Sequence, residues 1–297
     1  MHINTRTIAA IAEKECADHI RSPVFLMIAA TFTLVVLAWT YVKGMEVGYT
    51  VNVLGMPDIM RGFKGMAEVL GRFAPILGVI LGFETINKEI RSGSMNVLLT
   101  HPAFRDNIIL GKMLGSSIII FLTLFIAVNA AAGVLLAVSG MTFTFQYIVR
   151  LELFVILTFF YVLFYLGAAV LVSVFVRKQN VSLVTCIIFW MVTTILLSGL
   201  VYRLLLAATD DYQFAQHWTV FFLPVLPGHH YAMLSVGLQN VMGNFPPEPL
   251  IRGVFDTAFT LFDWFIAFLP NLIVLLGAPV ILISIAVGLF LRRDVTL

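Results

Sequence analysis

The chain has 297 residues, of which 60% are hydrophobic and only 11% are charged, and its mean hydropathy is +1.00. These values lie outside the range of soluble domains and predict an all-α integral membrane protein, because a bundle of spanning helices needs long apolar segments. The net charge of +2 indicates no particular partner, and nucleic acid is not expected as one. The two cysteines, Cys16 and Cys186, are expected to be packing residues rather than a disulfide or a metal site.

The N-terminal residues, from about 3 to 22, have the pattern of a helix that lies in the membrane interface. Apolar and weakly polar side chains recur there at spacings typical of one helix face: Ile8, Ile11, Ala12, Cys16, His19 and Ile20. The charged side chains of Glu13, Lys14, Asp18 and Arg21 fall on the other faces, so the segment is amphipathic. The alternative is a frayed tail, which is disfavoured because the apolar stripe leads directly into the next apolar run.

Long apolar runs predict six spanning helices. They cover residues 24–42, 66–88, 113–138, 153–176, 181–202 and 264–291. The first run is too long and starts too late to be a cleaved signal peptide. The second has an uncharged core of only residues 73–83 and must therefore be tilted, short or packed against protein. Ser139 and Gly140 predict a tight turn between the third and fourth helices.

An even number of spans places both termini on one side of the membrane. Eleven Lys and Arg residues then fall on the side of the termini and seven on the other side. The positive-inside rule therefore predicts cytoplasmic termini in a multi-pass protein of the cell's inner membrane. Residues 207–263 would lie outside, as a region interrupted by prolines such as Pro224 and Pro246.

The connector between the second and third spans, residues 85–112, is dense in charge. It belongs to the segment GFETINKEIRSGSMNVLLTHPAFRDNIILGKMLG, which runs from Gly82 to Gly115. Such a connector must lie in water and is expected to contact a partner. No charge lies inside the first, third, fifth or sixth span, so a proton- or sodium-coupled carrier is not expected. The chain also has no G-x-x-x-x-G-K-[ST] loop, so energy for uphill transport would have to come from that partner.

No catalytic residue is identified from the sequence. It contains no H-E-x-x-H, G-x-S-x-G or C-x-x-C motif. A cluster of three histidines in the outer region, near Met233 and Met242, offers imidazole and thioether groups that suit copper: His217, His229 and His230. The alternative is that these histidines cap helices or meet water. No cofactor is assigned to the chain itself.

The charged connector carries a family resemblance. The pattern G-F-E-x-I-x-x-E-x-x-x-G-S-x-x-x-L-L-x-x-P, followed by Gly111-Lys112-x-x-Gly115, resembles the first cytoplasmic loop of ABC-2 type permease subunits of ATP-binding cassette transporters. The order of these segments is most similar to the permeases that serve nitrous oxide reductase maturation. The resemblance implies that a coupling helix in the connector receives force from an ATPase subunit, through positions matching Glu84, Glu89, Arg91, Gly93, Ser94, His101, Pro102, Arg105 and Lys112. The alternative is that these charges only anchor two spans at the lipid headgroups.

The resemblance also sets expectations for the rest of the chain. It implies that the N-terminal helix is an elbow helix and that the outer region is re-entrant, with residues 239–263 in excess of what such a region needs. It implies an ATP-driven exporter in which separate nucleotide-binding subunits bind ATP and Mg²⁺, and in which the chain pairs with a second permease subunit. Two alternatives stay open: a complex that transmits mechanical force to an outside partner, and a metal-handling membrane protein or enzyme that uses the three histidines.

Overall fold

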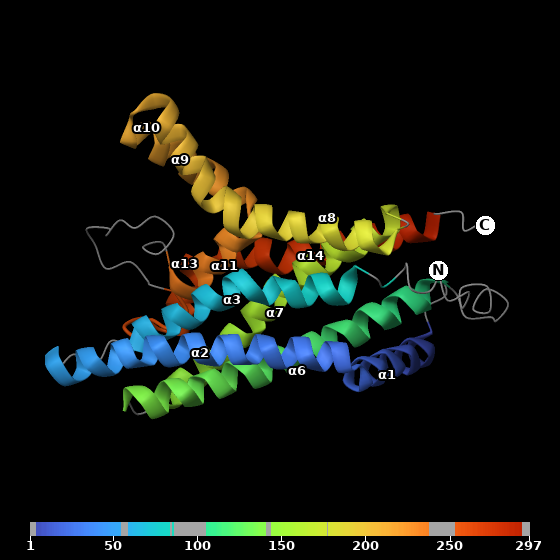
Figure 1. Ribbon diagram of the computed structural model, residues 1–297, viewed down its shortest axis with the longest axis horizontal. Helices are drawn as coiled ribbons and strands as arrows, with labels where there is room; N and C mark the ends of the chain where they lie inside the picture. The colour runs from blue at the N-terminus through green and yellow to red at the C-terminus, as the bar shows by residue number, and fades with distance from the viewer. Residues whose placement is uncertain are drawn as a thin grey trace.

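The computed structural model describes residues 4–54, 59–83, 85, 105–140, 144–176, 178–237 and 253–292. Within these ranges the chain is helical almost throughout and contains no strand. The long helices lie roughly along one axis, as Figure 1 shows. The first residues of α2 and the last residues of α14 lie at the same end of this bundle, which we call the termini end.

The helices of the described ranges follow one another in chain order. Their bounds are α1 Thr5–Arg21, α2 Pro23–Leu54, α3 Ile59–Gly82, α6 Arg105–Ser139, α7 Phe145–Phe175, α8 Gln179–Met191, the π-helix η1 Val192–Leu196, α9 Leu197–Thr209, α10 Tyr212–Phe222, the 3₁₀ helix η2 Leu223–Val225, α11 Pro227–Val236, α13 Leu261–Ala267 and α14 Leu269–Arg292. Five of them contain segments long and apolar enough to cross a membrane: Pro23–Gly48, Gly62–Gly82, Asp106–Ser139, Phe145–Phe175 and Leu269–Arg292. The prediction of an all-α integral membrane protein is confirmed.

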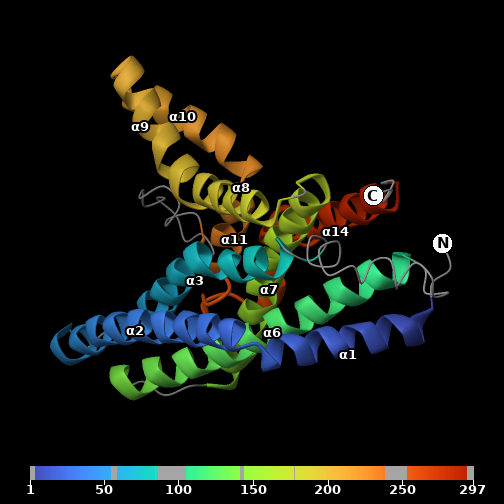
Figure 2. The ribbon, with the colours of Figure 1, turned by 45° about the vertical axis from the view of Figure 1, so that its right-hand side comes forward.

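The fifth predicted span corresponds to a more complex helical run. Its apolar part, Gln179–Ile195, is shorter than the five spanning segments. The run continues through the π-helix into α9, so that it changes direction and leaves the bundle (Figures 1 and 2). The apolar run predicted as the sixth span is divided into α13 and α14 at Phe268. The break fits Pro270, which lacks a backbone N–H and is tolerated only in the first turn of a helix.

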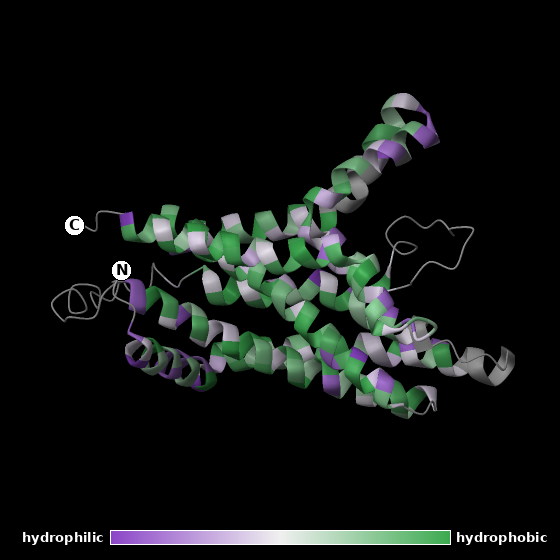
Figure 3. Cartoon of the chain, turned by 180° about the vertical axis from the view of Figure 1, so that it is seen from behind, coloured by the Kyte–Doolittle hydropathy of each residue, from purple (hydrophilic) through white to green (hydrophobic). Residues whose placement is uncertain are grey.

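The helix α1 lies beside α6 at the termini end, as Figure 2 shows. It begins at Asn4, whose side chain accepts hydrogen bonds from the backbone N–H groups of Arg6 and Thr7. In Figure 3 the bundle helices are mostly hydrophobic, whereas α1 carries hydrophilic residues along its length. Only Ala12 of α1 is fully buried, so the helix rests on the bundle by one face.

The centre of the bundle is α7, which packs against α3 on one side and α14 on another. Two glycines of α3 allow the backbones to approach closely. A Cβ atom on Gly78 would lie 2.6 Å from Val162 O, and one on Gly82 would lie 2.7 Å from Ala169 Cβ. Small residues at helix contacts are the usual means of tight packing in membranes.

The predicted outer region, residues 207–263, contains short helices that do not cross the bundle. The helices α9 and α10 form a hairpin that projects away from it (Figures 1 and 2). Asp210 turns the chain with a positive φ of 50°, and Asp211 caps α10 by accepting from Gln213 N and Phe214 N. The chain then returns, and α11 packs against α3, α7 and α14.

A buried arginine fastens the segment before α13 to the central helix. Arg150 of α7 is only 3% exposed, and its guanidinium donates to Val254 O at 2.7 Å and to Phe259 O. Gly253, with φ of 84°, lies so close to the backbone of Ser235 that a side chain would not fit. These contacts hold the end of α11 and the start of α13 against α7.

Candidate functional site

Most of the residues predicted to contact an ATPase lie outside the described residues. These are Glu84, Glu89, Arg91, Gly93, Ser94, His101 and Pro102. Arg105 is described as the first residue of α6, and Lys112 lies one to two turns farther along the same helix. The structure therefore places only the end of the predicted coupling segment, and that end is the start of α6.

Lys112 is buried in an ion pair within the chain. Its side chain is 11% exposed, and its Nζ lies 3.0 Å from Oε2 of Glu15 on α1. His19, one turn farther along α1, places its Nε2 3.4 Å from the other carboxylate oxygen. Burial acts to raise the pKa of the Glu15 carboxyl, but the contacts with His19 and Lys112 outweigh it and lower the pKa to about 2. The carboxylate and the ammonium thus hold α1 to α6.

The glycines on either side of this ion pair bring the two helices together. A Cβ atom on Gly111 would lie 2.7 Å from Ile11 Cβ, and one on Gly115 would lie 2.8 Å from Ala12 O. Cys16 Sγ donates to Gly115 O at 3.3 Å. We call this contact, formed by residues 4–19 of α1 and its cap with residues 107–115 of α6, the α1–α6 seam.

The sequence itself contains a signal for this seam, which differs from the predicted role of Lys112 in an ATPase contact. Glu15 lies at helical spacing within the apolar stripe of α1, between Ala12 and Cys16 and before His19. A carboxylate on the packing face of a helix needs a basic partner, because an unpaired buried charge is strongly unfavourable. The motif Gly111-Lys112-x-x-Gly115 supplies that partner and the room for it.

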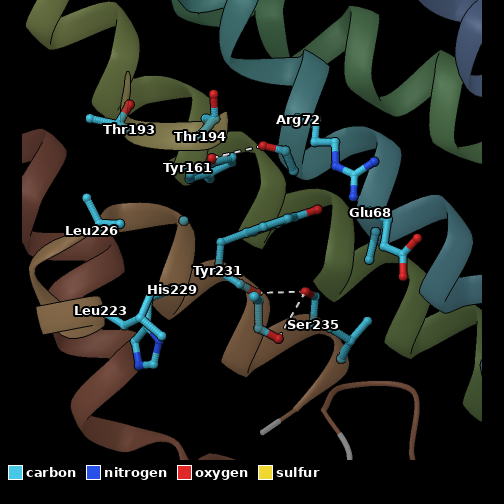
Figure 4. Close-up of a pocket in the computed structure, with 15 residues that line it drawn as sticks. Glu68, Arg72, Tyr161, Thr193, Thr194, Leu223, Leu226, His229, Tyr231 and Ser235 are labelled. Atoms are coloured by element: carbon cyan, nitrogen blue, oxygen red, sulfur yellow. Dashed lines mark hydrogen bonds between the residues drawn. The ribbon is translucent and has the colours of Figure 1, made fainter. Parts of the chain in front are cut away.

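A second feature is a cavity of about 330 Å³ beside the central helix, shown in Figure 4. It is lined by residues of α3, η1, η2 and α11 together with Tyr161 of α7, and it is partly open to the surface. The polar side chains that line it are Glu68, Arg72, Tyr161, Thr193, Thr194, His229, Tyr231 and Ser235. We call it the α3–α11 cavity.

The cavity lies where two of its helices depart from regular geometry. Pro75 lacks an N–H and leaves the carbonyl of Gly71 without its usual partner four residues on. Tyr161 donates its hydroxyl to that carbonyl at 3.0 Å, and Trp190 Nε1 donates to the next carbonyl, of Arg72, at 2.8 Å. Opposite α3, the π-helix Val192–Leu196 widens the helix at Thr193. Single π-helical turns of this kind occur often at functional sites.

The charges in the cavity differ from those in the α1–α6 seam. Glu68 and Arg72 are one turn apart on α3, and neither side chain makes an ion pair or hydrogen bond with the residues that the structure describes. His229 Nδ1 is buried and has no hydrogen-bond partner there. Burial, and secondly the neighbouring His230, lower the pKa of His229 to about 4, so its imidazole is neutral near pH 7.

The three histidines are not brought together as one set of metal ligands. His230 is buried, with Nδ1 2.8 Å from Asn271 Oδ1 and Nε2 2.8 Å from Pro224 O, so both ring nitrogens are engaged within the fold. His217 lies on the exposed face of α10. Over the described ranges no group of three His, Cys, Asp or Glu side chains could hold a metal ion, and Met242 falls outside those ranges.

Comparisons with known proteins agree with this architecture. A family model described as ABC-2 family transporter protein matches residues 9–295. A protein of Pseudomonas aeruginosa named "Probable ABC transporter permease protein NosY" is 32% identical over 130 residues, which cover 43% of this chain and 45% of that protein. Its namesake from Stutzerimonas stutzeri is 28% identical over 131 residues, covering 44% and 46%. The chain thus spans less than half the length of either relative that it matches. Because the family model extends over nearly all of the sequence, the chain belongs to the ABC-2 family of transporter proteins.

Proposed function

We propose that the chain is the membrane-spanning permease subunit of an ATP-driven exporter. It would act with separate nucleotide-binding subunits, which bind ATP and Mg²⁺, and with a second permease subunit. The sequence contains no G-x-x-x-x-G-K-[ST] loop, the motif that binds the phosphates of ATP in P-loop ATPases. This supports the assignment of ATP binding to separate subunits. The names of the two relatives, both permease proteins, support the same role.

The observation that carries this proposal is the α1–α6 seam. The predicted coupling segment ends where α6 begins, and the first turns of α6 are fixed to α1 by a buried ion pair and two close glycine contacts. Force applied to the segment would therefore move α1 and α6 as one body. The spanning part of α6, Asp106–Ser139, is 34 residues long, and at about 1.5 Å per residue it would carry that movement roughly 50 Å to the opposite end of the bundle.

The proposal includes an orientation, with the termini end of the bundle in the cytoplasm of an inner-membrane protein. Single cysteines test it in a chain whose own Cys16 and Cys186 are replaced by serine. Lys178→Cys lies at the termini end and Gln213→Cys on the projecting hairpin, and both positions are exposed. In intact cells, a reagent that does not cross the inner membrane should label Gln213→Cys only. Labelling of both positions, or of Lys178→Cys alone, would contradict this orientation.

The experiment that tests the function is purification of the chain together with the ATPase that accompanies it in the native membrane. The isolated chain should bind no ATP, whereas the complex should hydrolyse it. Alanine variants of Glu89 and Arg91 should assemble normally but lose the stimulation of hydrolysis by the permease. The sequence predicts that the connector lies in water, where a charge contributes little to stability but can determine a protein contact. Nucleotide binding by the isolated chain, or unchanged stimulation in both variants, would refute the proposal.

A further inference from the structure

Two oppositely charged side chains face a cavity inside the membrane domain. Glu68 is half-buried and Arg72 is exposed on α3, both within the spanning segment Gly62–Gly82. Figure 4 shows both side chains on the same side of the α3–α11 cavity. Ionisable side chains within spanning helices are unfavourable unless they are paired or serve a ligand, so their presence calls for a partner.

The described residues do not supply that partner. No ion pair or hydrogen bond to either side chain is formed within the described ranges, and Lys64, one turn before Glu68, does not line the cavity. In contrast, Lys112 and Arg150 lie in the same bundle and both have their groups engaged, by Glu15 and by backbone carbonyls. Lys112 and Arg150 are thus engaged by the fold itself, whereas Glu68 and Arg72 face the cavity without such contacts among the described residues.

The charge pattern of the cavity selects one class of ligand. A simple cation would satisfy Glu68 but be repelled by Arg72, and a simple anion would do the reverse. A molecule with an ammonium and a carboxylate close together would satisfy both at once, because residues four apart on a helix have Cβ atoms about 6 Å apart. The remaining polar lining is neutral: the hydroxyls of two threonines, two tyrosines and one serine, and His229 with a buried Nδ1 that has no described partner.

The size and the walls of the cavity fit a small molecule of this class. Its volume of about 330 Å³ is at the lower end of the range for ligand pockets, which favours a solute of amino-acid size. One wall is aromatic, formed by Tyr161 and Tyr231, whose rings stack with centroids 4.6 Å apart. Such a wall can cover an apolar side chain while the two charges hold the polar end.

We infer that the α3–α11 cavity is a binding site for a small zwitterionic solute of the amino-acid type, with its ammonium group on Glu68 and its carboxylate on Arg72. The part of this inference that makes the solute the exported substrate rests on the proposed export function. The part that makes the cavity its binding site rests on the cavity alone. The two parts are separated by measuring binding without ATP and hydrolysis with ATP on the same preparation.

The test uses the whole permease and ATPase complex in lipid nanodiscs and radiolabelled L-leucine at equilibrium. L-alanine should compete with leucine. Two compounds keep the side chain of leucine but only one of its charged groups: isopentylamine has the ammonium group and 4-methylpentanoate the carboxylate. Each of these two halves should compete at least about tenfold less well, because each leaves one charge of the site unsatisfied. Glu68→Gln and Arg72→Gln should each weaken leucine binding by about ten- to a hundredfold. Lys64→Gln, on the same helix but outside the cavity, is the matched control and should change it less than about twofold.

Several results would overturn the inference. The first is that neither amino acid binds at millimolar concentration. The second is that the two halves compete as well as L-alanine does, and the third is that Lys64→Gln weakens leucine binding as much as Glu68→Gln. Dissociation of the complex in Glu68→Gln or Arg72→Gln, seen by its mass, would assign the two charges to a subunit interface and would also overturn it. A complex that hydrolyses ATP but binds no zwitterion refutes this inference alone, whereas one that binds leucine without any ATP hydrolysis keeps the site and refutes the exporter.

Discussion

The α1–α6 seam and the α3–α11 cavity use charge in opposite ways. In the seam, Lys112 is buried and is matched by Glu15 at 3.0 Å, with glycines that let the helices touch. In the cavity, Glu68 and Arg72 find no partner among the described residues, and the helices around them are interrupted by Pro75 and a π-helix. The first region is built as a fixed joint, and the second leaves charges and space for a molecule from outside.

This difference determines what substitutions should do. Removing one member of the seam leaves a buried charge unsatisfied, which destabilises the folded state. Removing a charge from the cavity takes away a group that the fold itself does not use, so stability should change by no more than about 0.5 kcal/mol. The following predictions are ordered by the size of the expected effect on stability.

The largest effect is expected for Lys112→Ala. It leaves the Glu15 carboxylate in the seam without its ammonium partner, and breaking a buried pair in this way typically costs about 3–5 kcal/mol. The matched control is Lys43→Ala, which breaks the more exposed Lys43–Glu46 pair of α2 and should cost about 1 kcal/mol or less. Thermal unfolding of the purified complex measures both. Equal shifts for the two variants would show that the seam is not a fixed joint.

A smaller effect is expected for Gly115→Ala. The new Cβ atom would lie 2.8 Å from Ala12 O, a backbone atom that can move only with α1, and overpacking of this kind costs about 1–3 kcal/mol. Gly133→Ala on the same helix is the control, since no atom lies within 4 Å of the added Cβ there. It should be neutral or raise stability by up to about 1 kcal/mol, because alanine favours the helix. A loss in Gly133→Ala as large as that in Gly115→Ala would exclude close packing at the seam as the cause.

The smallest effect near neutral pH is a pH dependence, because it appears only in acid. The pKa of Glu15 is about 2 in the folded chain, below the ordinary glutamate value of 4.5, so the seam gains stability from this carboxylate above pH 4.5 and loses it as the pH falls toward 2. Hydrogen exchange of α1 should therefore increase with acid across this window in the native sequence. In Glu15→Gln, which cannot ionise, exchange should start higher and change less. An identical acid dependence in the two proteins would mean that Glu15 is not the group responsible.

The sequence predicted the parts of this structure that follow from local pattern. Apolar runs locate α2, α6, α7 and α14, and the stripe of small and apolar residues gives α1 its amphipathic character. The hairpin of α9 and α10 was not predicted, because α9 continues an apolar helix and only the π-helix at Val192–Leu196 changes its direction. A π-helix is a property of backbone hydrogen bonding that residue type does not specify.

The candidate sites were harder to predict, because each depends on contacts between residues far apart in the chain. Lys112 was assigned to an ATPase contact from its place in a motif, and its ion pair with Glu15 on another helix appears only in the fold. The three histidines are close in sequence, but both ring nitrogens of His230 are engaged by Asn271 and Pro224, whereas His217 lies on α10, in the hairpin that projects from the bundle. The α3–α11 cavity joins four separate segments, and no local pattern indicates their meeting.

In the proposed exporter, ATP-driven force moves the α1–α6 seam as one body, and release of a bound solute requires the α3–α11 cavity to change as well. Distances between paired spin labels test it in the permease and ATPase complex, without nucleotide and with ATP trapped by vanadate. One pair, at Glu13 and Leu114, crosses the seam, and the other, at Phe73 and Val225, crosses the region of the cavity, and all four positions are exposed. The seam distance should stay constant while the cavity distance shifts between the two states. A seam distance that changes as much as the cavity distance, or a cavity distance that does not change, would contradict it.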